Sequence, residues 1–391
     1  MRPAVPPIEG RLAARARSFA VGVGERLIAA DTADTVRGLN GVAGFALLHC
    51  ALGDLTGDER FTAAMHAGIR RAALLDGRPP IGLFGGISGL RAAAALAARD
   101  EPRYSKLLAQ CDAYVDSLLP QHPSKPQTFD DYDLISGWSG ARLARGVCGA
   151  CESDALVDLI VWTLGDLERW RCTHPLRSGE PPLNDLGIAH GLAGVLAALT
   201  LTVEPLDGSA GAAARYALNE LRGARVELDD CTVWPPALPA QRTPAHRSAW
   251  CYGAAGVAAV LHHAAKVLAD HETARMAARA VRELAAQPME SWMLEGEALC
   301  HGLMGNALCF AAVASATHDP QLCAAAMRVA ELVLDRLDEN DGRCWARDGS
   351  MSYYDAVELL DGVSGIALAL LTLTGDADSA WMRCFGLPPI A

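Results

Sequence analysis

Two kinds of helical pattern alternate along the chain. In the first kind, apolar residues occupy nearly every position, and helices with that pattern are buried on all sides. Residues 90–99, 257–268, 306–316 and 366–374 are examples. In the second kind, apolar residues recur at helical spacing; in residues 321–338 one stripe is formed by Met327, Ala330, Leu334 and Leu337. The same pattern occurs in residues 11–29, 60–75, 104–119, 155–170, 211–221 and 274–286. The alternation predicts fully buried inner helices covered by half-exposed outer helices.

A Gly-x-x-Gly turn opens each fully apolar segment. Successive turns begin 45, 51, 54, 62, 49 and 60 residues apart, and this regularity distinguishes them from chance matches in a chain with 37 glycines. A period in this range indicates a repeat architecture. Glycine at such a turn lets backbones approach closely and allows positive φ angles. The seven turns occupy residues 41–44, 86–89, 137–140, 191–194, 253–256, 302–305 and 362–365.

The repeats predict an all-α fold made of two-helix units. Abundant Ala and Leu together with only 6% aromatic residues favour helix over sheet. An inner ring of apolar helices inside an outer ring of amphipathic helices explains both patterns, and an open solenoid explains them nearly as well. No interval between turns has room for a second domain, so we expect residues 1–391 to form a single domain.

Composition excludes several classes of protein. The net charge of −12 argues against a nucleic-acid surface, which needs clustered Lys and Arg. The longest apolar stretch, residues 186–203, contains His190 and three glycines, which favours a buried helix over a transmembrane segment. The first residues lack the apolar core of a signal peptide. Twelve cysteines without such a signal favour a reducing compartment, and we expect a cytoplasmic protein.

The strongest candidate for chemistry is a set of metal ligands. Cys251, Cys300 and His301 would give zinc three ligands and leave a fourth position open. The 49 residues between Cys251 and Cys300 are far from a zinc-finger spacing, so the fold must bring two repeats together. Both cysteines lie two residues before a glycine turn, and equivalent positions in adjacent units should be neighbours. The alternative is two buried cysteines and a histidine that caps a helix.

Two further residues are candidates for proton transfer. His190 precedes Gly191 as His301 precedes Gly302, and it is either a general acid or base or a core histidine bonded to a carbonyl. Asp133 lies four residues before Gly137 and by itself is typical of a turn or capping residue.

Other polar residues near the turns have ordinary structural explanations when each is taken alone. Arg247 and Tyr252 flank Cys251, where each residue type is more often found at a surface or in packing. His262 and His263 lie within an apolar segment and are interpreted as structural. Asp361, directly before Gly362, is interpreted as a turn residue.

Taken together, four of these segments resemble the lanthionine synthetase C-like family, the cyclases of lanthipeptide biosynthesis. The matching segments are residues 132–140 (YDLISGWSG), 185–191 (DLGIAHG), 247–253 (RSAWCYG) and 300–302 (CHG). The WCYG motif followed by CHG about one repeat later is the specific part of this signature. The seven glycine turns extend the resemblance over almost the whole chain.

The resemblance implies a closed α/α toroid, or double barrel, of seven inner and seven outer helices. It implies that zinc is bound by Cys251, Cys300 and His301. It also places four side chains near the metal: His190 and Asp133 as proton-transfer candidates, with Arg247 and Tyr252 in the same cavity. His190 would protonate an enolate, Asp133 would hold the orientation of His190, and Arg247 would stabilise the enolate.

The family reaction is Michael-type addition of a peptide cysteine thiol to dehydroalanine or dehydrobutyrine, which closes lanthionine or methyllanthionine rings. The implied substrate is a dehydrated precursor peptide, and a separate dehydratase and a transporter are candidate partners. Two alternatives stay open. The protein could add glutathione or another small thiol to dehydroamino acids, or it could be a peptide-binding scaffold with structural zinc.

Overall fold

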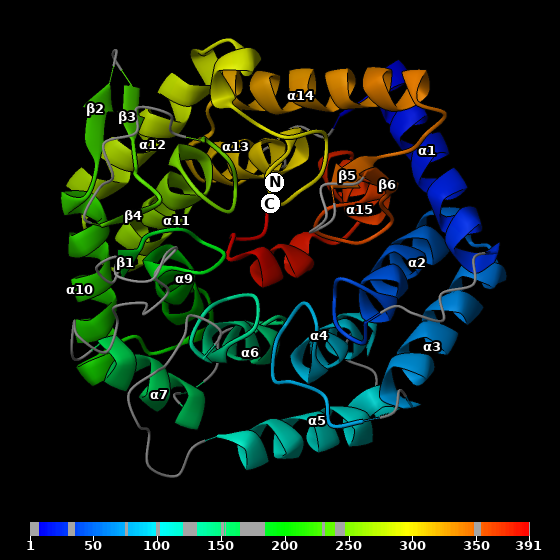
Figure 1. Cartoon of the computed structure of the whole chain (residues 1–391), viewed down its shortest axis with the longest axis horizontal. Helices are drawn as coiled ribbons and strands as arrows, with labels where there is room; N and C mark the ends of the chain where they lie inside the picture. The colour runs from blue at the N-terminus through cyan, green and yellow to red at the C-terminus, as the bar shows by residue number, and fades with distance from the viewer. Residues whose placement is uncertain are drawn as a thin grey trace.

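Two concentric rings of helices make up the fold in the computed structural model of the chain (Figure 1). The structure describes residues 8–29, 36–74, 77–98, 102–119, 131–149, 152, 154–164, 184–228, 231–238, 247–347 and 353–390. Within these ranges, seven inner and seven outer helices confirm the all-α toroid that the resemblance implied.

The inner ring consists of the helices that follow the glycine turns. They are apolar almost throughout, and every residue of α9 and α15 is buried. This burial confirms the prediction from the first kind of pattern. The inner helices are α2 (Val42–Thr56), α4 (Ile87–Ala98), α6 (Trp138–Arg145), α9 (Leu192–Thr202), α11 (Ala254–Val267), α13 (Leu303–Thr317) and α15 (Val363–Leu373).

The outer ring consists of amphipathic helices that each bury one face. Asp319 caps α14, because its carboxylate accepts the backbone N–H groups of Gln321 and Leu322 and Pro320 opens the first turn. The outer helices are α1 (Gly10–Ala29), α3 (Glu59–Leu74), α5 (Ser105–Leu118), α7 (Ala155–Leu164), α10 (Gly208–Gly223), α12 (His271–Ala286) and α14 (Pro320–Glu339).

Two details of the outer ring differ from the sequence predictions. The stripe assigned to α14 was wrong at Met327, which is exposed, because the buried face runs through Ala326, Val329 and Val333 instead. These positions are three and four residues apart, and Met327 falls just outside that face. The helix expected over residues 155–170 is described only as far as Leu164, and residues 165–170 lie outside the described ranges.

The ring is closed, which excludes the open solenoid. Each inner helix contacts the next around the ring, and α15 contacts α2. The first outer helix, α1, packs on the last inner helix, α15, and the Ile8 N–H donates to the Leu373 carbonyl at 3.0 Å. Segments from the two ends of the chain therefore complete the circle side by side (Figure 1).

The second glycine of each turn is required because a backbone carbonyl occupies the place of its side chain. A Cβ atom there would lie 1.8–2.2 Å from the carbonyl oxygen of a residue five or six positions earlier, a distance no real contact allows. The loop therefore folds tightly over the first turn of the inner helix. Positive φ, the other property expected of these turns, occurs among the fourteen turn glycines only at Gly253, whose φ is 106°. Elsewhere close approach alone selects glycine. The second glycines are Gly44, Gly89, Gly140, Gly194, Gly256, Gly305 and Gly365.

A circle of hydrogen bonds joins the seven loops. In six of the seven repeats, the carbonyl two residues before the first glycine of the turn accepts at least one backbone N–H from the preceding repeat, at 2.9–3.2 Å. The accepting residues are Phe84, Ile135, Ala189, Cys251, Cys300 and Leu360. The seventh step uses a side chain, since the Leu360 N–H donates to Asn40 Oδ1 at 2.9 Å.

The C-terminal segment fills the middle of the inner ring. Its 3₁₀ helix η4 (Ser379–Phe385) lies at the centre of the toroid in Figure 1. Phe385 packs against the rings of Phe84, Trp250 and Trp381, with centroids 5.0–5.5 Å apart. The Trp250 indole also donates to the Phe385 carbonyl at 2.8 Å. A barrel of helices leaves a space along its axis. The buried side chains of η4 fill that space and extend the hydrophobic core into it.

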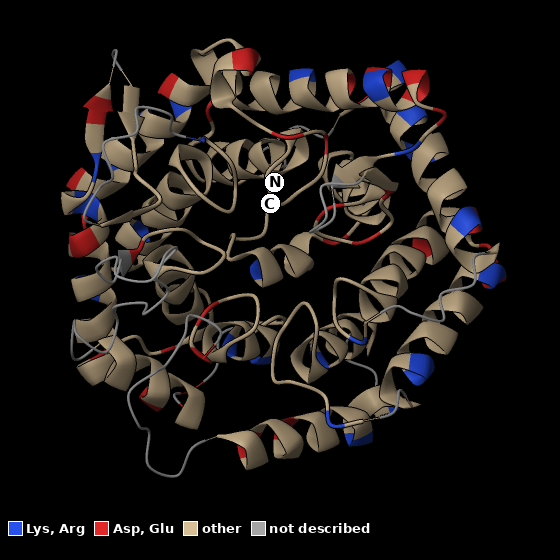
Figure 2. Ribbon diagram, in the orientation of Figure 1, with Lys and Arg blue, Asp and Glu red and all other residues tan. Residues whose placement is uncertain are grey.

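The connections carry short antiparallel ribbons and two more 3₁₀ helices, η1 (Pro102–Tyr104) and η3 (Met289–Trp292). Charged residues lie mainly on the outer helices and loops (Figure 2). None of the described helices meets the length and hydropathy needed to span a lipid bilayer. All ten cysteines in the described ranges are free thiols. The ribbons pair β1 (Asn184–Asp185) with β4 (Ala237–Leu238), β2 (Val226–Leu228) with β3 (Cys231–Val233), and β5 (Trp345–Arg347) with β6 (Tyr353–Asp355).

Replacing a second glycine should destabilise the whole ring. In Gly89→Ala the new Cβ would lie 2.1 Å from the Leu83 carbonyl oxygen and 2.5 Å from the Leu39 nitrogen of the neighbouring repeat. We expect the free energy of unfolding, measured in urea, to fall by about 3 kcal/mol or more. Gly22→Ala is the matched control, because Gly22 lies in α1 with nothing within 4 Å of its Cβ position. That change should stabilise the protein by about 0.5–1 kcal/mol. Equal effects of the two variants would contradict the packing explanation.

Candidate metal centre

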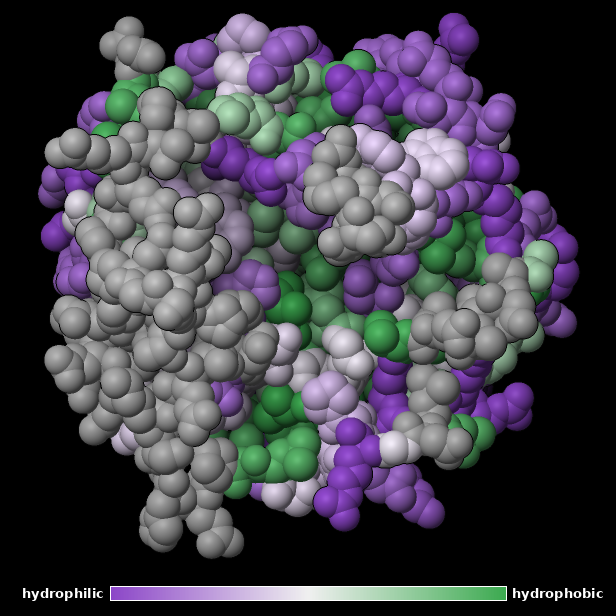
Figure 3. Space-filling view, in the orientation of Figure 1, coloured by the Kyte–Doolittle hydropathy of each residue, from purple (hydrophilic) through white to green (hydrophobic). Residues whose placement is uncertain are grey.

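The loop end of the toroid gathers the residues that directly precede the glycine turns. Because the loops are joined in a circle, these residues lie in adjacent positions around it. In the space-filling view of the face seen in Figure 1, apolar residues are visible near the centre, bordered by polar ones (Figure 3). From the first repeat to the seventh, the residues before the first glycine are Asn40, Gly85, Ser136, His190, Tyr252, His301 and Asp361.

Cys251, Cys300 and His301 meet at one point of this circle. One possible ligand atom from each lies within 4.8 Å of the other two. The Cys251 N–H donates to the Cys300 carbonyl at 3.1 Å, so the same loop-to-loop bond that joins the repeats brings the two thiols together. Cys251 is buried, and Cys300 and His301 are half-buried. Two sulfurs and one imidazole nitrogen at this separation fit the donor set and the spacing of a zinc site with one open position.

The three side chains shift one another's pKa values through hydrogen bonds and charge. The Cys300 thiol and the His301 ring hydrogen bond to the Cys251 sulfur and lower the pKa of Cys251 to about 5. The same hydrogen bond and burial raise the pKa of Cys300. The bond to Cys251 also raises the pKa of His301. The cluster therefore concentrates negative charge on one sulfur, as a cation site requires.

His190 is held by Asp133. Its Nδ1 lies 2.5 Å from Asp133 Oδ2, and Asp133 is fully buried while the His190 side chain is 29% exposed. The other oxygen, Oδ1, accepts the N–H groups of Ser136 at 2.6 Å and Gly137 at 2.9 Å. Burial raises the pKa of Asp133, and the contact with His190 opposes that rise. Asp133 is thus both the turn residue that its position suggests and the partner of His190.

Tyr252 is held in a similar way by Asp185, which sequence reasoning used only as part of a motif. The Tyr252 hydroxyl donates to Asp185 Oδ2 at 2.7 Å, and the Gly187 N–H donates to Oδ1 at 2.8 Å. Burial raises the pKa of Asp185 to about 6. Burial and the adjacent carboxylate raise the pKa of Tyr252. The rings of Tyr252 and His190 lie 6.4 Å apart, so the residue that directly follows Cys251 is also a neighbour of His190.

Two more acids, neither of them predicted as a site residue, lie close to His301. Glu295 pairs with the guanidinium of Arg247, and its second oxygen is 3.9 Å from His301 Nε2. The Arg247 charge contributes to the low pKa of Cys251. Asp361, interpreted as a turn residue, has Oδ1 3.9 Å from His301 Nδ1. Asp361 precedes Gly362 as His301 precedes Gly302, and this equivalent position in the repeat could have predicted that the two side chains are neighbours.

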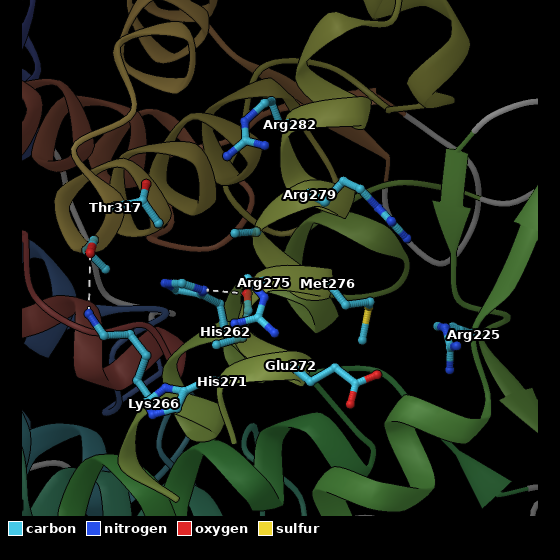
Figure 4. Close-up of a pocket in the computed structure, with 13 residues that line it drawn as sticks. Arg225, His262, Lys266, His271, Glu272, Arg275, Met276, Arg279, Arg282 and Thr317 are labelled. Atoms are coloured by element: carbon cyan, nitrogen blue, oxygen red, sulfur yellow. Dashed lines mark hydrogen bonds between the residues drawn. The ribbon is translucent and has the colours of Figure 1, made fainter. Parts of the chain in front are cut away.

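A cavity lies elsewhere, on α11, α12 and the end of α13 (Figure 4). Its volume is about 830 Å³. Two of its arginines are neutralised nearby: Arg282 by Asp319 at 2.6 Å and Arg279 by Glu283 at 3.2 Å. His262 on its wall bonds the Ala274 carbonyl through Nδ1 at 3.0 Å, in line with the structural role expected for it. None of the lining residues belongs to the metal-ligand cluster, so cavity size does not identify the site.

Comparison with known proteins agrees with the architecture. Residues 35–385 match the family described as lanthionine synthetase C-like protein. Among solved structures, the fold is similar to that of nisin cyclase, with a TM-score of 0.71 and 15% sequence identity. The match covers 95% of this chain and 96% of the other.

The raised pKa of Asp185 predicts a pH-dependent stability. Folded Asp185 binds its proton more tightly than the unfolded chain, whose Asp pKa is about 3.9, so its contribution to stability falls as pH rises from about 4 to about 6. Asparagine does not titrate, so Asp185→Asn removes this pH-dependent loss of stability. The stability of the variant relative to wild type should be roughly 2 kcal/mol greater at pH 7 than at pH 4.

The measurement is urea unfolding of both proteins at the two pH values, with EDTA present so that metal binding does not contribute. Asp270→Asn is the control of opposite sign, because hydrogen bonds from Thr273 lower the pKa of Asp270. Its relative stability should not rise between pH 4 and pH 7. A pH-independent difference between Asp185→Asn and wild type would contradict the electrostatic explanation.

Proposed function

Because the chain belongs to the lanthionine synthetase C-like family, we propose that it is a zinc-dependent lanthipeptide cyclase. The observation that carries this proposal is the cluster of Cys251, Cys300 and His301 within 4.8 Å, beside the Asp133–His190 pair. The substrate would be a precursor peptide that contains cysteine and dehydroalanine or dehydrobutyrine. A separate dehydratase would make that substrate, a transporter would export the product, and residues 1–391 would act as one catalytic unit in the cytoplasm.

Cys251, Cys300 and His301 are the residues that would hold zinc. When bound, zinc would supply a Lewis acid with one open position that lowers the pKa of a substrate thiol from its usual value of about 8.5. The protein's own contribution is a preassembled set of donors. The bond between the Cys251 N–H and the Cys300 carbonyl and the packed inner helices fix the two sulfurs before any ligand arrives.

The reaction is an addition in which atoms and electrons balance without a redox partner. The substrate thiolate forms a bond to the β-carbon of the dehydroamino acid, and the thiol proton leaves to solvent. The π electrons move to the α-carbon and its carbonyl, and the α-carbon then takes up a proton. The product therefore has the same mass as the substrate.

We assign the proton delivered to the α-carbon to His190. Asp133 accepts from Nδ1 and fixes the tautomer, so Nε2 is the nitrogen that exchanges a proton with the substrate. Tyr252 is the less suitable acid, because its hydroxyl donates to Asp185 and its pKa is raised. Arg247, paired with Glu295 and near Cys251, is positioned to stabilise negative charge on the enolate oxygen.

The decisive experiment incubates a dehydrated, cysteine-containing peptide with the protein, zinc and glutathione, and then alkylates the remaining thiols. A cyclase consumes peptide thiols without changing the mass, so each ring removes one alkyl group from the final mass spectrum. Addition of a small thiol would instead increase the mass by one glutathione and leave the peptide thiols intact. An unchanged peptide would support only the structural-zinc scaffold.

Removal of one ligand should abolish metal binding. In Cys300→Ala we expect zinc content after dialysis to fall from about one per chain to near zero, because two donors hold zinc weakly. Cyclisation should be lost with it. Cys323→Ala is the matched control, since this buried cysteine lies on α14 outside the cluster. A Cys300→Ala protein that retains one zinc per chain would remove Cys300 from the ligand set.

Replacement of the proposed acid should affect turnover and not metal binding. His190→Asn should lower kcat by about 10²- to 10⁴-fold, the usual contribution of a general acid, with zinc content unchanged. KM should change little, since the proton is transferred only after the substrate is bound. The rate is measured by thiol consumption at fixed peptide concentrations. An unaltered kcat would show that another group protonates the α-carbon.

A further inference from the structure

Asp185 makes contacts that a turn residue alone does not need. One carboxylate oxygen accepts the Gly187 N–H at 2.8 Å, which closes the local turn. The other oxygen accepts the Tyr252 hydroxyl at 2.7 Å, and Tyr252 belongs to the next repeat. The two carboxylate oxygens thus bind different partners, one in the same loop and one a side chain from the neighbouring loop.

The local sequence leaves a place for the tyrosine ring. A Cβ at Gly187 would lie 2.7 Å from Cδ1 and Cε1 of Tyr252 and 2.6 Å from the Cys251 carbonyl oxygen. Glycine at this position therefore lets the ring lie flat against the backbone and extend its hydroxyl to Asp185. The ring lies beside that of His190, with centroids 6.4 Å apart, and Tyr252 directly follows Cys251 in the chain.

The same arrangement occurs one repeat earlier. Asp133 binds backbone N–H groups of its own turn with one oxygen and holds His190, from the next repeat, with the other. Asp185 binds Gly187 with one oxygen and holds Tyr252 with the other. Two acids in consecutive repeats therefore each hold the residue that precedes the following glycine turn.

We propose that Asp185 is a positioning residue that fixes the Tyr252 ring beside His190 and next to the candidate ligand Cys251. The inference rests on the proposed function, because the fixed ring adjoins both the group that would protonate the substrate and a residue that would hold zinc. With the ring fixed, a dehydroamino acid bound against it meets both groups at once. Asp185 acts through Tyr252 and does not itself touch the reacting atoms.

Asp185→Asn tests this directly. If the asparagine Oδ1 keeps the Gly187 N–H, its NH₂ group faces the Tyr252 hydroxyl, which loses its carboxylate acceptor and retains at most a weaker, neutral hydrogen bond. We expect kcat to fall by about 10- to 100-fold, the cost of a misplaced group in a preorganised site, with zinc content unchanged. We also expect the variant to be more stable than wild type at pH 7 relative to pH 4. A purely structural turn residue would lose activity only together with stability.

The coupling to Tyr252 is measured with Tyr252→Phe and the double variant. If Asp185 acts through the tyrosine hydroxyl, Tyr252→Phe lowers kcat to a similar extent, and adding Asp185→Asn lowers it no further. Asp270→Asn, a capping acid on α12, should leave kcat unchanged in both backgrounds. Equal and independent losses from Asp185→Asn and Tyr252→Phe would overturn the proposal.

Crystal structures of the wild type and Asp185→Ala, which offers the Tyr252 hydroxyl no partner, separate this inference from the proposed function. The tyrosine ring should move away from His190 in the variant whether or not the protein cyclises a peptide. A wild-type protein without cyclase activity would defeat the proposed function and leave the displacement of Tyr252 as the test of positioning. A ring that stays in place in Asp185→Ala would overturn the positioning role even in an active enzyme.

Discussion

The circle of loop-to-loop hydrogen bonds is the constraint on which the rest of the structure depends. Six of the seven repeats offer the carbonyl two residues before the glycine turn to a backbone N–H of the repeat before it. A chain of such bonds in an open array would leave an unsatisfied group at each end, and buried backbone groups are costly when unsatisfied. Here Asn40 supplies the last acceptor through its side chain, and the circle closes on Leu360. The small second glycines make this possible, because a side chain at any of them would push the loop away from its helix.

The same circle of hydrogen bonds determines which polar side chains lie close together. Positions that are equivalent in the repeat become neighbours in space, so residues about fifty positions apart in the chain touch one another. Cys251 and Cys300 occupy the same slot in consecutive repeats and are joined by a backbone hydrogen bond. The pairs Asp133–His190, Asp185–Tyr252 and Glu295–Arg247 each link one repeat to the next. A rigid ring of backbone thus holds a set of side chains whose relative positions a flexible loop would not maintain.

The candidate site also contains buried ionisable side chains that the packing of the helices does not require. Asp133 is fully buried, Asp185 has a pKa raised to about 6, and one thiol of the cysteine pair has a pKa lowered to about 5. Burying carboxylates opposes folding unless hydrogen bonds satisfy them, and here backbone N–H groups and neighbouring side chains do so. Perturbed pKa values of this kind are typical of functional sites, which often lower the stability of a protein.

The sequence by itself determined the repeat, the inner and outer helices, and the cysteine–histidine set, because helix periodicity and glycine turns are local properties of the chain. The resemblance of four segments to a known family added His190, Asp133, Arg247 and Tyr252 as candidate site residues, and their roles stay predictions. Only the tertiary structure decided that the ring closes, that Met327 faces solvent, and that positive φ is confined to Gly253 among the turn glycines. It also decided that Asp185, Glu295 and Asp361 lie beside the candidate site. Each of these outcomes depends on contacts between repeats, and a one-dimensional pattern carries no information about which side chains from different repeats come within hydrogen-bonding distance.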